Sequence, residues 1–138
     1  MSHNHKKICA LGALYNGDKP EYLSDCLKSL RKQTLRIPII LVVDGPISNE
    51  LEEVLESFDD LNIRLIRKAN NSGLSAALQQ GLDSVEDEFE YAIRFDSDDI
   101  NLPNRFDAIC NYLDERKPDL VSSHMHEIDE NGIVFSVR

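Results

Sequence analysis

Short apolar runs alternate with amphipathic segments along this chain, and that alternation constrains the fold more than any other feature. Apolar runs of strand length predict buried strands at 7–15, 39–43 and 91–95, and residues 62–66 alternate in polarity like a further strand. Apolar residues at helical spacing predict helices at 21–35, 48–58, 74–82 and 103–116. Strands that alternate with helices form mostly parallel sheets. The sequence therefore predicts an α/β fold, with helices on both faces of a mostly parallel sheet.

The C-terminal part adds two further elements to this prediction. Leu120–Ser123 is expected to form a fifth strand. Met125–Val137 is expected to form a hairpin, because Asn131-Gly132 is a strong hairpin-turn signal. His124 and His126 share one face of that segment, which suggests either a metal site or, as favoured here, two solvated side chains.

A cluster of acidic residues, Asp96-Ser97-Asp98-Asp99, follows the apolar run at 91–95. Open α/β sheets bind ligands beyond the carboxyl ends of their strands, and clustered carboxylates repel one another unless a cation shares the site. Mg²⁺ typically takes one or two carboxylates together with substrate phosphates. The cluster therefore predicts a divalent-metal site that holds a diphosphate, although acids at such a position also cap helices or lie solvated in loops.

Two other predicted strands end in polar or turn residues, Tyr15-Asn16 and Asp44-Gly45. Taken alone, Asp44-Gly45-Pro46 is typical of an ordinary turn. In a parallel sheet, however, the carboxyl ends of the strands point to the same edge. We therefore expect these two segments to line one crevice with the acidic cluster.

Composition narrows the class of protein. A net charge of −10 argues against a nucleic-acid-binding surface, no segment approaches the roughly 20 apolar residues of a membrane span, and the polar start does not fit a signal peptide. Three cysteines in apolar contexts predict buried thiols in a reducing compartment, at Cys9, Cys26 and Cys110. The length of 138 residues suits one domain, expected at 7–138 after a disordered polar tail at 1–6 that contains His3 and His5.

Other classes of protein that use clustered acids fit less well. An EF-hand loop counted from Asp96 would need Gly and Glu where the chain has Asn101 and Asp107. A haloacid-dehalogenase-type phosphatase and a receiver domain both place acids after the first strand, which here ends in Tyr15-Asn16. The chain has neither a Gly-rich phosphate loop nor a dinucleotide-binding glycine motif.

With these motifs in this order, the chain resembles the family 2 glycosyltransferases. The matching elements are Tyr15-Asn16, Val42-Val43-Asp44-Gly45, the spaced set Asn71, Gly73, Ala77 and Gly81, the Asp96-x-Asp98-Asp99 motif, and Pro103. Each motif alone is weak, but their order and spacing together are specific and cover nearly the whole chain. The resemblance is strongest to enzymes that build bacterial polysaccharides. It implies a GT-A fold, a Rossmann-like and mostly parallel sheet flanked by helices that binds nucleotide diphosphate sugars.

The resemblance also implies roles for individual residues. The expected nucleotide-sugar-binding residues are Ala13, Leu14, Tyr15, Asp44, Lys68, Asn71, Gly73, Asp96 and Ser97. Within that set, the backbone of 13–15 would contact the nucleotide base, and Asp44 would lie beside the base or ribose. Asp98 would coordinate Mg²⁺ or Mn²⁺ between the two phosphates, and Asp96 would face either the ribose or the same metal ion. Asp99 would touch the sugar or support its neighbours.

The chain departs from the family pattern in three ways. Family members commonly carry two adjacent acids before the glycine, whereas Val43 precedes Asp44 here, and Gln79 stands where the family often has Asn. The family's catalytic base lies well after the metal motif, in the half that binds the acceptor. That base is therefore expected beyond Arg138, so we expect a C-terminally truncated GT-A domain that lacks its acceptor half and is inactive alone.

The implied function is transfer of a sugar from a nucleotide diphosphate sugar, with a UDP-sugar as the first expectation. The implied acceptor is a glycan or a lipid-linked molecule in cell-surface polysaccharide biosynthesis. The alternative is a non-catalytic nucleotide-sugar-binding or regulatory module of the same fold. The implied location is cytoplasmic, with peripheral association at the inner face of the plasma membrane as a further expectation.

Overall fold

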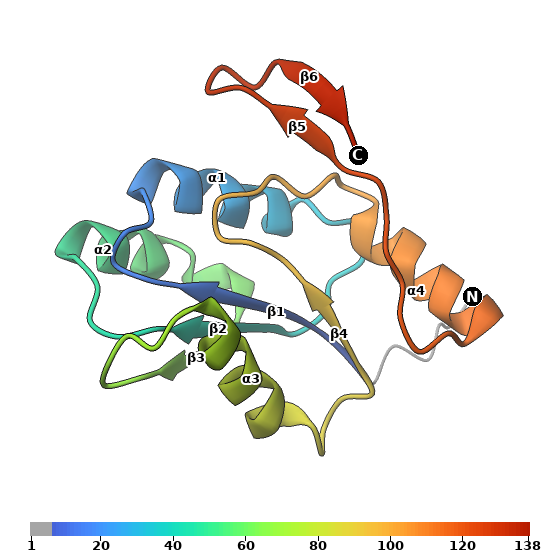
Figure 1. Cartoon of the computed structure of the whole chain (residues 1–138), viewed down its shortest axis with the longest axis horizontal. Coiled ribbons are helices and arrows are strands. Elements are labelled where there is room, and N and C mark those ends of the chain that lie inside the picture. The colour runs from blue at the N-terminus through green and yellow to red at the C-terminus, as the bar shows by residue number, and fades with distance from the viewer. Residues whose placement is uncertain (1–6) are drawn as a thin grey trace.

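The computed structural model describes residues 7–138, so the predicted tail at 1–6 lies outside the described residues. Figure 1 shows a four-stranded sheet between helices and a separate two-stranded hairpin. The main sheet has the strand order β3-β2-β1-β4, and all of its neighbouring strands are parallel. Its strands are β1 (Ile8–Leu14), β2 (Ile39–Val43), β3 (Ile63–Arg67) and β4 (Tyr91–Arg94). The predicted parallel sheet is confirmed.

Helices cover both faces of this sheet, as the sequence predicts. The α-helices are α1 (Pro20–Arg31), α2 (Asn49–Ser57), α3 (Leu74–Val85) and α4 (Arg105–Arg116), and a short 3-10 helix at Asp59–Leu61 precedes β3. Buried side chains of α1, α2 and α4 form one core with the sheet, whereas those of α3 pack on its opposite face (Figure 1). The sheet therefore separates two apolar cores.

Local sequence explains where several of these elements begin and end. All five residues of β2 are buried, which suits an aliphatic strand between two helical layers. The α2 helix is capped by Ser48, whose side chain accepts a hydrogen bond from the Leu51 N–H at 3.2 Å. The α1 helix ends at Arg31, before the predicted Leu35, and the next segment turns toward α4, where the Thr34 N–H donates to the Pro103 carbonyl at 2.8 Å.

The α3 helix lies unusually close to the sheet. Its buried residues are Ala77, Leu78, Gly81 and Val85, while Leu74 and Leu82 of the predicted stripe are exposed. A Cβ atom at Gly81 would lie 2.7 Å from Leu11 Cδ1 and 2.9 Å from Val42 Cγ2. Glycine at this position therefore allows the helix backbone to approach β1 and β2.

The prediction of a fifth strand at Leu120–Ser123 is wrong. This segment has no strand structure and runs over the surface, with Leu120 89% exposed. A strand needs a neighbour that satisfies its backbone N–H and C=O groups, and two apolar residues followed by two serines bury too little surface to hold one against the sheet. The Pro118 carbonyl instead accepts a hydrogen bond from the Tyr91 hydroxyl at 3.0 Å.

The predicted hairpin is confirmed. Strands β5 (His126–Ile128) and β6 (Val134–Val137) pair antiparallel across a turn that contains Gly132 at φ +82°. The hairpin stands apart from both cores in Figure 1, and most of its apolar side chains are exposed. His124 and His126 are also exposed, as the solvated interpretation expects.

Two further expectations can be compared with the structure. The three cysteines are free and buried, as predicted, and burial raises the pKa of Cys9 and of Cys110 to about 11. Over residues 7–138, none of the helices has the length and apolar character needed to cross a bilayer.

Candidate nucleotide-binding edge

The carboxyl ends of β1, β2 and β4 lie next to one another at one edge of the sheet. The Asp44 N–H, just after β2, donates to the Leu14 carbonyl at 2.7 Å. The Phe95 N–H, just after β4, donates to the Leu11 carbonyl at 3.1 Å. Because β1 is hydrogen-bonded to both neighbours, the three segments that the sequence singles out converge as expected.

Asp44 is buried and bonded to its own chain. The residue is 3% exposed, and its carboxylate accepts hydrogen bonds from the backbone N–H groups of Ser72 and Gly73, both at 3.0 Å. Lys68 forms an ion pair with the same carboxylate at 3.2 Å and also bonds to the Ser72 hydroxyl. Burial opposes the charge of Asp44, but these bonds outweigh it and lower its pKa.

These contacts fix the loop that leads into α3. Gly45 has φ +92°, and a Cβ atom there would lie 2.7 Å from the Asn71 backbone nitrogen. The Asn71 side chain in turn accepts a hydrogen bond from the Gly73 N–H at 3.2 Å. Asn71 and Gly73, both predicted to bind the nucleotide sugar, are exposed and lie directly against the turn that follows β2.

The acidic loop, residues 96–99, lies at the end of β4 with Asp96 and Asp98 exposed. Asp96 forms an ion pair with Arg94 at 2.8 Å, and its backbone carbonyl accepts a hydrogen bond from the Cys26 thiol at 3.4 Å. Partial burial and the charges of Asp96 and Asp98 raise the pKa of Asp99. A bound cation would relieve this repulsion.

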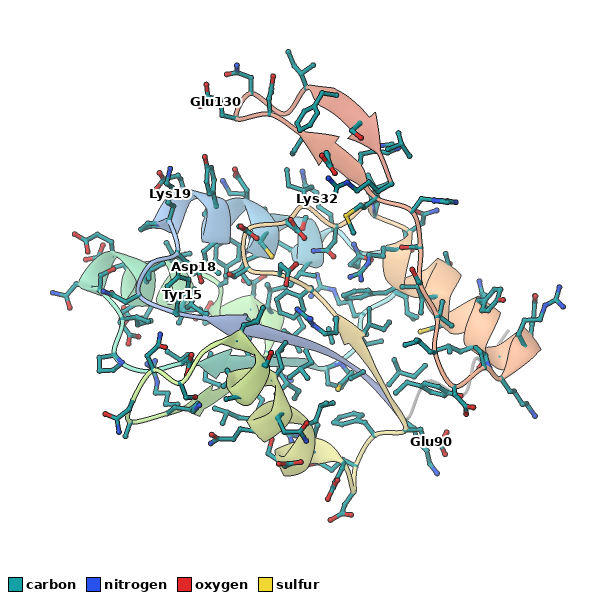
Figure 2. All side chains as sticks on the ribbon, in the orientation of Figure 1. Tyr15, Asp18, Lys19, Lys32, Glu90 and Glu130 are labelled. Atoms are coloured by element: carbon teal, nitrogen blue, oxygen red, sulfur yellow. The ribbon has the colours of Figure 1, made fainter. Side chains whose placement is uncertain are left out.

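One side chain links the acidic loop to the loop after β1. The Asp18 carboxylate oxygen Oδ2 accepts a hydrogen bond from the Ser97 hydroxyl at 3.0 Å and another from the Tyr15 N–H at 3.0 Å. Figure 2 shows Tyr15 and Asp18 close together in the loop between β1 and α1. Ser97 is 6% exposed, whereas Tyr15 is 48% exposed and presents its ring at the surface.

A buried polar network supports the acidic loop from behind. The Arg105 guanidinium donates to the Arg94 carbonyl at 2.6 Å and to the Asn101 side chain at 2.8 Å, so one cation holds both sides of the loop. Ser29 Oγ accepts a hydrogen bond from the Asn101 N–H at 2.9 Å. Gln33, two residues after α1, donates to the Leu102 carbonyl and accepts from the Phe106 N–H, which ties the segment after α1 to α4.

Sequence reasoning missed these supporting residues. Ser29 and Gln33 offered a signal, because Ser29 lies on the buried stripe of α1 with Cys26 and Leu30, and Gln33 is buried just beyond the end of that helix. Polar residues on an apolar helical face are buried only with hydrogen-bond partners. Asp18 gave no such signal, since an aspartate in a turn is common and its second partner is 79 positions away.

The carboxylates of the acidic loop are the candidate ligands for a divalent cation. Over residues 7–138, no group of three or more His, Cys, Asp or Glu side chains is arranged to hold a metal ion. Asp96 and Asp98 are nevertheless exposed carboxylates at a strand end. Mg²⁺ usually keeps several waters and binds one or two carboxylates together with substrate phosphates, so these residues fit a cation that arrives with a diphosphate.

The remaining predicted residues lie at the same edge. Ala13 is half-buried and Leu14 is buried, so these two residues offer their backbone rather than their side chains. Lys68 points at Asp44, and its side chain is 11% exposed. All of the residues predicted from the sequence therefore lie in the loops or strand ends of one edge.

The chain that forms this parallel sheet and its acidic edge matches the model of a known protein family. The family model for glycosyl transferase family 2 matches residues 13–135, which include all three strand ends. The chain belongs to glycosyltransferase family 2.

Its relatives include enzymes of bacterial polysaccharide biosynthesis. The chain is 40% identical over 124 residues to the amylovoran biosynthesis glycosyltransferase AmsE of Erwinia amylovora, covering 87% of this chain and 46% of that protein. It is 36% identical over 144 residues to the Escherichia coli UDP-Gal:alpha-D-GlcNAc-diphosphoundecaprenol beta-1,3-galactosyltransferase, covering 99% of this chain and 52% of that protein. The chain thus spans about half the length of these curated relatives.

Solved structures share the fold. S. aureus TarS 1-349 in complex with UDP matches 80% of this chain and 33% of that chain, with a TM-score of 0.69 and 22% identity. The complex of the same protein with UDP-GlcNAc also gives a TM-score of 0.69, at 23% identity, over 80% of this chain and 32% of that chain. The predicted GT-A fold is confirmed.

Proposed function

We propose that this chain is the donor-binding part of a glycosyltransferase that uses a nucleotide diphosphate sugar, with a UDP-sugar as the donor. Placement of exposed Asp96 and Asp98 at the same sheet edge as the carboxyl ends of β1 and β2 carries this proposal. The E. coli relative is named for UDP-Gal, and TarS has been solved with UDP and with UDP-GlcNAc. The full-length protein would transfer the sugar to a glycan or lipid-linked acceptor in polysaccharide biosynthesis, in the cytoplasm.

Each side of the proposed site has its own task. The half-exposed Tyr15 ring and the backbone of 13–15 would hold the base, at the end of the central strand. Asp98 and Asp96 would hold Mg²⁺ or Mn²⁺. A bound cation would neutralise charge on the diphosphate as its bond to the sugar breaks. Arg94 balances the charge of Asp96 before ligands arrive.

The loop after β3 would complete the donor side of this site. Asp44 keeps Lys68 and the 70–73 loop in place, so its effect on the nucleotide would pass through Asn71 and Gly73. Lys68 is neutralised by Asp44 in this arrangement, and its contact with the nucleotide stays a prediction.

The experiment that tests the proposal is a calorimetric titration with a panel of nucleotides. UDP, GDP and dTDP would each be titrated with Mn²⁺, with Mg²⁺ and with no divalent cation. We expect UDP to bind most tightly and to need a cation for full affinity. Absence of binding by all three nucleotides, or binding that ignores the cation, would contradict the proposal.

The Asp98→Asn variant tests the cation assignment. Loss of one carboxylate ligand is expected to weaken UDP binding in Mn²⁺ by more than about tenfold, because metal affinity falls at least that much when its ligand shell is disturbed. Binding without a cation should change little. Asp87→Asn is the matched control, since Asp87 is an exposed acid in the turn between α3 and β4. An equal effect of the two variants would remove Asp98 from the site.

A further inference from the structure

Asp18 lies between the two halves of the proposed site without belonging to either. Its Oδ2 atom accepts a hydrogen bond from the Tyr15 N–H, in the loop proposed to hold the base, at 3.0 Å. The same atom accepts a hydrogen bond from the Ser97 hydroxyl, in the acidic loop proposed to hold the cation, also at 3.0 Å. A single carboxylate oxygen therefore joins the two loops.

We infer that Asp18 is a positioning residue that joins the base-binding loop to the cation-binding loop, so that a nucleotide diphosphate meets both in a fixed relative position. The inference rests on the proposed function and deepens it. Asp18 would touch neither the base nor the phosphates. It would act through Tyr15 and Ser97.

The hydrogen bond between Ser97 and Asp18 fixes the acidic loop. Ser97 is 6% exposed, and a hydroxyl with so little access to water needs a partner within the protein. The Asp18 carboxylate is that partner. Because Ser97 stands between Asp96 and Asp98 in the chain, holding its side chain inward leaves those two carboxylates on the exposed side of the loop.

The hydrogen bonds between Tyr15 and Asp18 fix the loop after β1. Asp18 and Tyr15 bond reciprocally, since the Asp18 N–H donates to the Tyr15 carbonyl at 3.1 Å while the Tyr15 N–H donates to the Asp18 carboxylate. The Tyr15 ring lies over Gly17, where a Cβ atom would be 2.4 Å from the ring. The turn therefore holds both the backbone and the ring of Tyr15.

Two variants distinguish the effect of the two Asp18 hydrogen bonds from the effect of its negative charge. Asp18→Asn and Asp18→Ala both remove the negative charge, but only asparagine keeps an oxygen that accepts both hydrogen bonds. We expect Asp18→Ala to weaken UDP binding in Mn²⁺ about tenfold, as expected for losing these two bonds, and Asp18→Asn to stay within about twofold of the wild type. Calorimetric titration measures both, and thermal denaturation checks that each variant is folded.

A double-mutant cycle with Ser97→Ala tests the connection itself. If Asp18 acts through Ser97, the effect of Asp18→Ala on UDP affinity is smaller in the Ser97→Ala background than in the wild type. Additive effects would overturn the inference. Should Asp18→Ala not fold, Ser97→Ala decides in its place: removing the hydroxyl that bonds to Asp18 is expected to weaken UDP binding in Mn²⁺ about fivefold, and an affinity equal to that of the wild type would overturn the inference.

The outcomes distinguish the two proposals. A wild-type chain that fails to bind UDP with either cation would remove the proposed function, and this inference with it. A wild-type chain that binds UDP, with Asp18→Ala and Asp18→Asn binding equally well, would overturn the inference alone and leave the proposed function in place.

Discussion

At the scale of single residues, Asp44 shows how an acid at a strand end can organise a site from beneath its surface. Its carboxylate is buried and holds Lys68 together with the backbone of Ser72 and Gly73. A buried charge with partners on several sides fixes each of them, because moving any one would leave the charge less well compensated. Asp44 therefore positions the loop that contains Asn71.

The Asp44→Ala variant is expected to lose about 2 kcal/mol of unfolding free energy, because it leaves the N–H groups of Ser72 and Gly73 and the Lys68 ammonium without their acceptor. Urea denaturation measures the loss. A free energy of unfolding equal to that of the wild type would show that these contacts contribute nothing to stability.

The contribution of Asp44 should also depend on pH. Its folded-state pKa lies below the ordinary value of 3.8, so its stabilising effect is present above that value and is lost as pH falls through the lowered pKa. The gap in unfolding free energy between the wild type and Asp44→Asn should therefore narrow below about pH 4. A gap that stays constant from pH 7 to pH 3 would contradict this assignment.

At the scale of elements, the turns after the strands determine how closely the loops approach one another. Gly45 follows β2 with φ +92°, and its Cα faces the Asn71 backbone so closely that a Cβ atom would lie 2.7 Å from the Asn71 nitrogen. Gly132 in the hairpin turn has a similar φ of +82° but nothing within 4 Å of its Cβ position. Both glycines have a left-handed backbone that would strain a residue with a Cβ atom, but only Gly45 lies in close contact with another segment.

Alanine at these two positions distinguishes the cost of a left-handed backbone from the cost of close contact with a neighbouring segment. Gly132→Ala is expected to cost about 1 kcal/mol, from the left-handed backbone alone. Gly45→Ala is expected to cost about 2 kcal/mol more, because the Asn71 backbone has to move. Chemical denaturation of both variants gives the comparison. Equal losses would mean that the approach of Gly45 to Asn71 does not constrain the fold.

The sequence allowed most of the elements to be predicted, because their signals are local. The five aliphatic residues of β2 and the Asn131-Gly132 turn define their structure within a few positions. The strand expected at Leu120–Ser123 failed because strand formation depends on a neighbour, which no local pattern supplies. Residue patterns thus identify a helix or a turn more safely than an edge strand.

The candidate site was predictable only in outline. Its edge of the sheet followed from topology, since strand ends in a parallel sheet face the same way. The partners of Asp44 and Asp18 were not predictable, because they come from loops 28 and 79 positions away. Which side chains a carboxylate meets across such a separation depends on packing of the whole fold.

At the scale of the whole molecule, the two cores that stabilise the fold lie on the faces of the sheet, whereas the candidate site lies at its carboxyl edge. Neighbouring residues of β1 alternate between two cores, with Ala10 and Leu14 in one and Cys9 and Leu11 in the other. Both cores are closed by helices (Figure 1), while the loops that join strands to helices gather at the carboxyl edge. Loops at this edge can carry exposed charge without disturbing either core.

The most direct test of this account is an NMR measurement of the whole chain with UDP and paramagnetic Mn²⁺, which broadens the amide signals of residues near the bound ion. We predict the strongest broadening at residues 96–99 and weaker broadening at Tyr15, with the signals of residues 88–90 before β4 retained. Broadening centred on residues 88–90 or on the hairpin at 126–137, or no broadening that depends on UDP, would contradict a cation and nucleotide site at the carboxyl edge of the sheet.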